Sequence, residues 1–129
     1  AKNESDARRR GFLESCIESG LLSVWIYEAP FPATPARRAI VSALTVEAVK
    51  QDAGRLVLER GDPSRDRLDR QEIERSLRAT GGDIPYSHDP PGSYAGLEVA
   101  DVAAWAYGAR RDWTKTVAPL IEFVRELSP

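Results

Sequence analysis

Short apolar runs alternate with longer helical patterns along this chain, and that alternation limits the folds open to it. β-Branched and aromatic residues are concentrated at 22–28, a short apolar run lies at 55–60, and a weaker run lies at 83–88. Glycine or proline bounds each run, and a segment with helical spacing of apolar residues follows it. Strands that alternate with helices form a mainly parallel sheet flanked by helices, so the sequence predicts an α/β fold.

Caps, chain breakers and apolar spacing place the helices. We expect five of them, at 5–20, 34–54, 67–82, 94–107 and 114–127. Asp69, followed three residues later by Glu72, resembles a capping box near the start of the third helix. In the last helix, apolar residues from Val117 to Leu127 recur at the spacing of a core-facing stripe.

The length of the chain sets the number of domains and the size of the sheet. A chain of 129 residues suits a single α/β domain, residues 1–129, built around one hydrophobic core. Three strands make a small sheet for such a fold. We therefore expect either a fragment that lacks an N-terminal strand region, or another chain, such as a second copy in a homo-oligomer, that completes the core.

Charge and hydropathy exclude some classes of function. The net charge of −2 argues against a protein that coats nucleic acid without sequence preference. Arginine clusters at 8–10, 37–38 and 110–111 are typical of solvated helix faces. No apolar run approaches the roughly 20 residues that span a bilayer, and no signal-peptide pattern is present. We therefore expect a cytoplasmic protein without membrane contact.

One aspartate interrupts the most apolar of the predicted helices. In "GLEVADVAAWAYG", apolar residues surround Asp101 on nearly every side, which predicts a buried helix. A buried aspartate must be paired, hydrogen-bonded, bound to a metal or turned toward a cleft. Glu98 lies on the same helix face and could present a second carboxylate. The alternative is a structural role, in which Asp101 pairs with Arg60 or bonds to Trp113.

A second group of acidic residues follows the predicted strand at 55–60. Glu59 lies at the end of that strand, and Asp62, Asp66 and Asp69 come after it. Ligands bind at the carboxyl ends of strands in parallel α/β sheets, and clustered carboxylates there can bind Mg²⁺. The alternative is ordinary local chemistry, with Asp62 in a turn and Asp69 capping a helix.

The chain has one histidine and one cysteine. His88, at the end of the third predicted strand and beside Asp89, could act as a general base or metal ligand, or simply be exposed in a loop. Cys16 falls in step with the apolar residues of the first helix, which indicates a small buried hydrophobe rather than a nucleophile.

Several short motifs resemble one family of bacterial proteins. The segment 97–101 matches a leucine–x–x–alanine–aspartate motif, and Ala104-Trp105 and Asp112-Trp113 follow it. "SDARRR" and "LVLERGDPSRDRLDRQEI" extend the similarity along most of the chain. On these motifs the chain resembles the C-terminal part of the domain of unknown function 3800 family, in its actinobacterial branch.

The resemblance implies the latter part of a ribonuclease H-like fold and a metal-dependent phosphodiester nuclease. It matches Asp101 with the terminal aspartate of the family, and Glu59 with a middle carboxylate for which Asp62 is the substitute. The family also carries an Asp-Glu-Ser-Gly strand with a metal ligand near its N-terminus, and this sequence does not contain that motif.

Two functional hypotheses follow. In the first, the protein is a nuclease, a hydrolase that cleaves nucleic acid with Mg²⁺ or Mn²⁺. Asp101, Glu59 and Asp69 would bind the metal, Asp101, Glu59 and Asp62 would be catalytic, and arginines would contact phosphate. In the second, it is a non-catalytic protein-interaction or oligomerisation module with Asp101 as a structural acid, and aromatic residues such as Trp25, Tyr27 and Trp105 pack against a partner.

Overall fold

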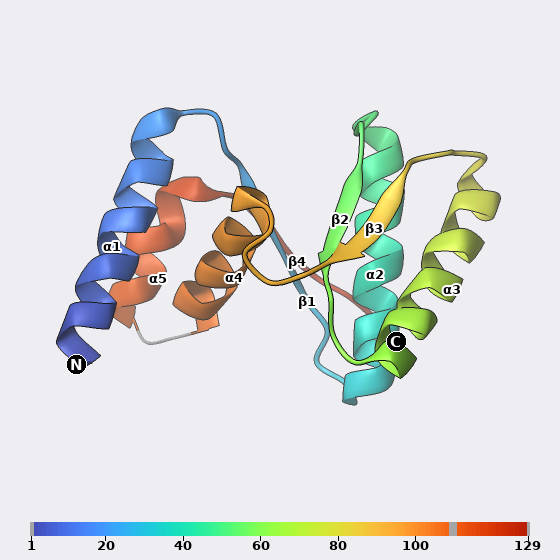
Figure 1. Ribbon diagram of the computed structural model, residues 1–129, viewed down its shortest axis with the longest axis horizontal. Coiled ribbons are helices and arrows are strands. Elements are labelled where there is room, and N and C mark those ends of the chain that lie inside the picture. Colours follow the sequence, from blue (N-terminus) through green and yellow to red (C-terminus); the bar gives the residue numbers. More distant parts are fainter. Residues whose placement is uncertain (1, 109–110, 129) are drawn as a thin grey trace. The chain divides into compact units, whose positions relative to one another are not determined.

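The computed structural model describes residues 2–108 and 111–128 and confirms the α/β class (Figure 1). The elements are α1 (Lys2–Ser19), β1 (Val24–Glu28), α2 (Ala33–Lys50), β2 (Leu56–Glu59), α3 (Pro63–Thr80), β3 (Tyr86–Asp89), α4 (Ala95–Gly108), α5 (Arg111–Val117), the 3₁₀ turn η1 (Ala118–Leu120) and β4 (Ile121–Glu126). The strands form two sheets of two strands each, β1 with β4 and β2 with β3, in place of one larger sheet. Among the described residues, no helix is both long and apolar enough to cross a membrane.

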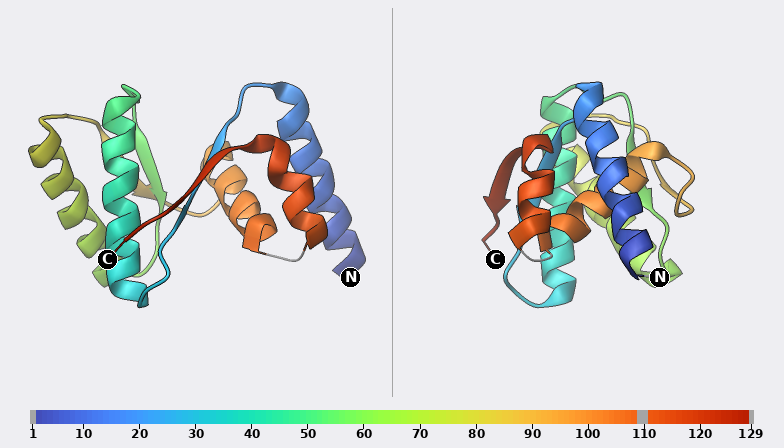
Figure 2. Two further views of the ribbon diagram at one scale, coloured as in Figure 1. Left: turned by 180° about the vertical axis from the view of Figure 1, so that it is seen from behind. Right: turned by 90° about the vertical axis from the view of Figure 1, so that its left-hand side faces the viewer.

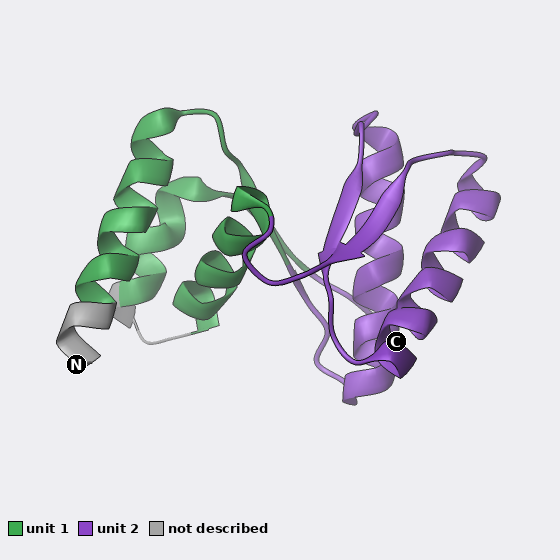
Figure 3. Cartoon of the chain, viewed as in Figure 1, with its two compact units in different colours: residues 1–26, 94–125 green, residues 27–93, 126–129 purple. Residues whose placement is uncertain are grey.

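The chain divides into two compact units (Figure 3). Unit 1 comprises residues 1–26 and 94–125, and unit 2 comprises residues 27–93 and 126–129. Each unit has its own buried apolar cluster, so two clusters take the place of the single expected core.

Three α-helices and the 3₁₀ turn build the apolar cluster of unit 1. Its buried residues come from α1, α4, α5 and η1, and are Leu13, Cys16, Val99, Ala103, Ala106, Val117 and Leu120. Leu13 and Cys16 confirm the apolar stripe predicted for the first helix. Burial raises the pKa of the Cys16 thiol, and the nearby charge of Glu98 adds to the effect. This thiol therefore ionises less readily than an exposed one, as expected for a packing residue.

In unit 2, β2 and β3 are parallel and in register, with Leu56 opposite Tyr86 and Leu58 opposite His88. Side chains alternate between the two faces of a strand, so these four residues share one face of the sheet. Helices α2 and α3 lie side by side against that face (Figures 1 and 2). The apolar cluster between them contains Val41, Leu58, Ile73, Leu77 and Ile84. A polar residue at position 88 is thereby placed under the helices.

The end of the chain differs from the prediction. The helix expected at 114–127 is wrong, because α5 ends at Val117 and residues 121–126 form β4. Pro119 lies in η1, where its missing N–H and its ring interrupt the α-helical hydrogen bonds. The residues after it include Ile121, Phe123 and Val124, which suit a strand, and β1 supplies the partner.

Replacing Ile73 by alanine should destabilise the protein by about 3 kcal/mol, because it leaves a cavity in the core of unit 2. The Ile73 side chain is completely buried. Leu68→Ala on the same helix is the matched control, since Leu68 is 44% exposed and its loss should change the free energy of unfolding by less than about 0.5 kcal/mol. Urea denaturation measures both, and equal losses would contradict this account of the core.

Tyr86 should titrate unusually late. Burial and the hydrogen bond to the Glu74 carboxylate raise the pKa of Tyr86 to about 12. In the unfolded chain a tyrosine titrates at about pH 10. The stability that the neutral Tyr86 phenol contributes is therefore fully present below that pH, and it is lost as the pH rises through the folded pKa. Tyr86→Phe should remove the phenolate absorbance step at a pH of about 12 and flatten the alkaline loss of stability. A wild-type titration in which every tyrosine ionises at its ordinary pKa would contradict the assignment.

Candidate functional site

Two carboxylates and one imidazole meet between α3 and β3 in unit 2. Asp66 and Asp69 are three residues apart on α3 and therefore share a helix face, which lies over His88 of β3. One ligand atom from each of the three residues lies within 4.8 Å of the others. The side chains of Asp66, Asp69 and His88 are 7%, 3% and 5% exposed. We call this group the acidic cluster.

Hydrogen bonds fix the geometry of the acidic cluster. His88 Nε2 is 3.0 Å from Asp69 Oδ2 and 3.8 Å from Asp66 Oδ1. Both oxygens of Asp66 accept from the backbone N–H of Gly61, at 3.0 and 3.1 Å. His88 Nδ1 is also buried, and no described residue bonds to it. An unpaired nitrogen in a covered site is costly, so His88 is a feature that needs an explanation.

Arg37 of α2 neutralises part of this charge. Its Nε and Nη2 donate to Asp69 Oδ1 and Oδ2 at 2.9 and 2.8 Å, a bidentate pair. Burial alone would raise the pKa of Asp69, but the hydrogen bonds from Arg37 and His88 outweigh burial and lower it. The hydrogen bond to Asp69 also raises the pKa of Arg37. Asp69 is therefore held ionised inside the protein.

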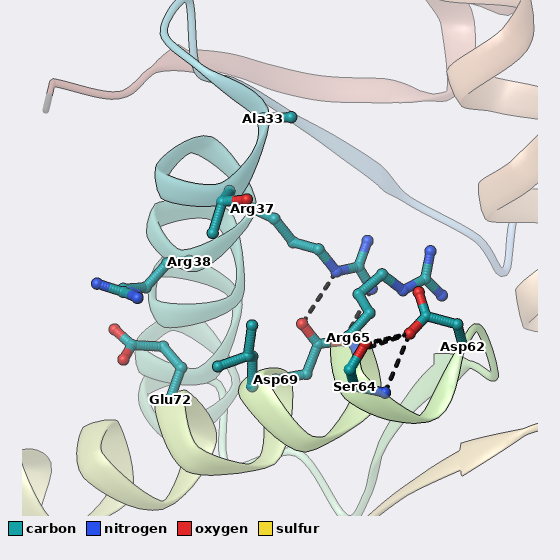
Figure 4. Close-up of a pocket in the computed structure, with 10 residues that line it drawn as sticks. Ala33, Arg37, Arg38, Asp62, Ser64, Arg65, Asp69 and Glu72 are labelled. Carbon is teal, nitrogen blue, oxygen red and sulfur yellow. Dashed lines mark hydrogen bonds and ion pairs between the residues drawn. The ribbon is translucent and has the colours of Figure 1, made fainter.

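A groove of about 330 Å³ lies beside the acidic cluster, between the beginnings of α2 and α3 (Figure 4). Its lining residues are Ala33, Thr34, Arg37, Arg38, Asp62, Ser64, Arg65, Leu68, Asp69 and Glu72. Figure 4 shows the guanidinium groups of Arg37 and Arg65 on one side of the groove and Arg38 near Glu72 on the other. Positive groups thus border a cavity that contains one member of the acidic cluster.

The structure includes Asp69 in the cluster but does not bring Glu59 into it. Glu59 is exposed at the end of β2, paired with Asp89 in the register. It follows Leu58, so its side chain belongs to the sheet face opposite to that of His88. Among the four carboxylates near the strand end, Asp66 and Asp69 are the two that meet an imidazole.

Asp62 has the capping role that the sequence assigned to Asp69. Helix α3 starts at Pro63, and Asp62 Oδ1 accepts from the backbone N–H groups of Ser64 and Arg65 at 3.0 and 3.1 Å. The prediction of Asp69 as the cap is therefore wrong, because proline at the first helical position starts the helix earlier. The bond from the Ser64 hydroxyl, followed by these backbone bonds, lowers the pKa of Asp62.

Asp101 is exposed on α4, so the prediction of a helix buried on all sides is wrong. Only Val99, Ala103 and Ala106 are buried in this helix, and they form a single stripe. No ion pair or side-chain hydrogen bond joins Asp101 to Arg60 or to Trp113, whose side chains the structure describes. It belongs to unit 1 and remains a candidate apart from the acidic cluster.

Arg37 and the burial of His88 were missed from the sequence. Of the two alternatives for His88, the exposed loop histidine is wrong, because its side chain in β3 is buried. Two signals in the sequence point to the acidic cluster. Tyr86 and His88 are two residues apart and so share one strand face, and Asp66 and Asp69 lie at helical spacing from the apolar Ile73. No local signal identifies Arg37 as the partner of Asp69, because the two are 32 residues apart.

Comparison with known proteins identifies no relative: no protein-family model, no curated protein and no solved structure matches the chain significantly. The similarity to the domain of unknown function 3800 family therefore rests on the short sequence motifs alone.

Arg37→Ala should lower the free energy of unfolding by about 2 kcal/mol. Removing one partner of a buried ion pair costs roughly 3–5 kcal/mol, and access of water to the arginine reduces this cost. The Arg37 side chain is 38% exposed, whereas Asp69 is 3% exposed. Arg38→Ala, next in the chain and without an ion pair among the described residues, should change stability by less than about 0.5 kcal/mol. Similar losses in the two variants, measured by urea denaturation, would refute the buried pair.

Proposed function

We propose that this protein is a divalent-cation-dependent hydrolase of phosphodiesters, a nuclease, with its cation site at the acidic cluster. The observation that carries the proposal is the meeting of two buried carboxylates with a buried imidazole beside a groove lined by arginines. Carboxylates bind hard divalent cations, and arginines bind phosphate. Sites that cleave phosphodiesters combine these two chemistries.

Oxygens of Asp66 and Asp69 and Nε2 of His88 would bind the cation. When bound, it would polarise a phosphoryl oxygen and lower the pKa of a coordinated water. An imidazole ligand favours Mn²⁺ over Mg²⁺, because Mg²⁺ prefers oxygen ligands alone. The proposed metal is therefore Mn²⁺, and Mg²⁺ should bind to the same site more weakly. Arg37 and Arg65 would contact the phosphate.

The bidentate contact of Arg37 with Asp69 favours a second function. It occupies both oxygens of one proposed ligand, as a purely structural ion pair would. On that hypothesis the protein is a non-catalytic interaction module, and the acidic cluster only joins α2, α3 and β3. The two functions differ in a measurable way, because a structural network does not gain stability from added cation.

A titration with Mn²⁺ tests the proposed function. Calorimetry should show one cation bound to the wild-type chain, with weaker binding of Mg²⁺. Asp69→Asn and Asp66→Asn keep the size of the side chain but remove the charge, and each should weaken Mn²⁺ binding by at least about tenfold. Wild-type protein should hydrolyse bis(p-nitrophenyl) phosphate in Mn²⁺ but not in a chelator, and Asp69→Asn should be inactive.

Asp83→Asn is the matched control, because Asp83 is an exposed aspartate of the same unit. It should bind Mn²⁺ like the wild type. Asp101→Asn and Glu59→Gln separately test the two carboxylates that the family resemblance implies. If the wild type does not bind Mn²⁺, the proposal is wrong and the interaction module is the better account. If only Asp101→Asn or Glu59→Gln loses Mn²⁺, the cation site lies outside the acidic cluster.

A further inference from the structure

We infer that the groove binds the phosphate group of a single nucleotide between Arg37 and Arg65, and that a cation in the acidic cluster strengthens this binding. The inference rests on the proposed function, because it assigns the cation to that cluster. It adds a binding site for the substrate, the size of the substrate and the order in which the two ligands bind.

Arg65 is the first component of the site. Its guanidinium lies directly over the Cα of Gly61, where an added Cβ would be 1.9 Å from Nη2 and 2.1 Å from Cζ. Its Nε is buried and has no hydrogen bond to a described residue, and its Nη2 makes one long contact of 3.4 Å to the carbonyl oxygen of Glu59. The Asp66 carboxylate is 3.8 Å from Nε, too far for a hydrogen bond. A guanidinium that has only one long hydrogen bond to the protein keeps donors to spare and is suited to an anion.

Arg37 is the second component. Nε and Nη2 bond to Asp69, and no described residue accepts from its Nη1. Figure 4 shows the guanidinium groups of Arg37 and Arg65 turned toward the same side of the groove. Two guanidinium groups that converge in this way match the several acceptor oxygens of a phosphate, which one group alone would leave unpaired.

The charges explain why a cation should bind first. Asp62, Asp66 and Asp69 supply three carboxylates around the two guanidinium groups, so the site has one negative charge in excess. A phosphate entering that site is opposed by the excess charge, whereas a divalent cation reverses its sign. A cation bound to Asp69 also competes with Arg37 for the same oxygens, which frees Arg37 to donate to the phosphate.

The size and lining of the groove define the ligand. A volume of about 330 Å³ lies at the lower end of the roughly 300–1,000 Å³ typical of small-molecule sites, which is enough for about one nucleotide and not for a duplex. Ala33 and Leu68 line the groove as well, and Leu68 is 44% exposed. An exposed leucine beside two arginines suits a ligand with an apolar ring and a charged end. A nucleoside monophosphate, free or at the end of a strand, has both.

Binding of adenosine 5′-monophosphate tests the inference. Calorimetry should show that saturating Mn²⁺ lowers its Kd by at least about tenfold relative to a chelator, within the usual range for coupling between two sites. Adenosine should bind at least about tenfold more weakly than the nucleotide in Mn²⁺, because it lacks the phosphate. A dinucleotide with a 5′ phosphate distinguishes a free nucleotide from the end of a strand. If it binds as tightly as adenosine 5′-monophosphate, the ligand is the end of a strand; if it binds more weakly, the ligand is the free nucleotide.

Three variants place the phosphate: two that each remove one arginine charge and one that keeps every charge. Arg65→Gln should weaken nucleotide binding in Mn²⁺ by about tenfold or more while Mn²⁺ binding persists. Gly61→Ala keeps every charge but displaces the Arg65 guanidinium, and should have a similar effect. Arg67→Gln removes one charge from an exposed arginine of the same helix that does not line the groove, and should bind the nucleotide like the wild type. Circular dichroism confirms that each variant is folded.

The possible failures are distinguishable. If Mn²⁺ does not bind to the wild type, the proposed function fails and this inference fails with it. If Mn²⁺ binds but does not raise nucleotide affinity, the inference alone is overturned. The same holds if Arg65→Gln and Arg67→Gln bind the nucleotide equally, or if adenosine binds as tightly as its monophosphate.

Discussion

The parallel register of β2 with β3 is the constraint on which the candidate site depends. It places His88 opposite Leu58, and therefore on the sheet face covered by α2 and α3. A shift of one residue would put Asp89 under the helices instead and turn the imidazole to the other face. The apolar cluster of unit 2 resists that shift, because Leu56 and Leu58 contribute to it from the same face.

Burying charge beneath these helices requires compensation. Two carboxylates removed from water are unfavourable unless donors surround them, and here the donors come from three places. The Gly61 backbone serves Asp66, Arg37 serves Asp69, and His88 lies close to both. This arrangement is stable enough to form part of a folded protein, yet it retains an unpaired His88 Nδ1 and an unpaired Arg65 Nε among the described atoms. Arg65 Nε belongs to the phosphate site that we propose, whereas His88 Nδ1 is the ring nitrogen that does not contact the carboxylates.

Local signals in the sequence predicted many of the elements and part of the site. The α/β class, four of the five helices and the strands near 24, 56 and 86 follow from apolar spacing and from glycine and proline positions. The helix expected at 114–127 failed because the apolar residues after Pro119 also suit a strand, and only the availability of β1 decides between the two. Of the residues proposed as metal ligands, Asp69 is buried in a group that could bind a cation, whereas Glu59 and Asp101 are exposed.

The sequence by itself determined the α/β class and most of the helices and strands, since caps, breakers and periodicity act over a few residues. It also placed Asp62, Asp66 and Asp69 shortly after the end of a strand, because that position depends only on neighbouring residues in the chain. Tertiary structure alone decided which carboxylates became buried, which arginine neutralised them and that His88 lay beside them. Those outcomes depend on contacts between residues 19 or more positions apart, whose energies arise only when α2, α3 and β3 pack together.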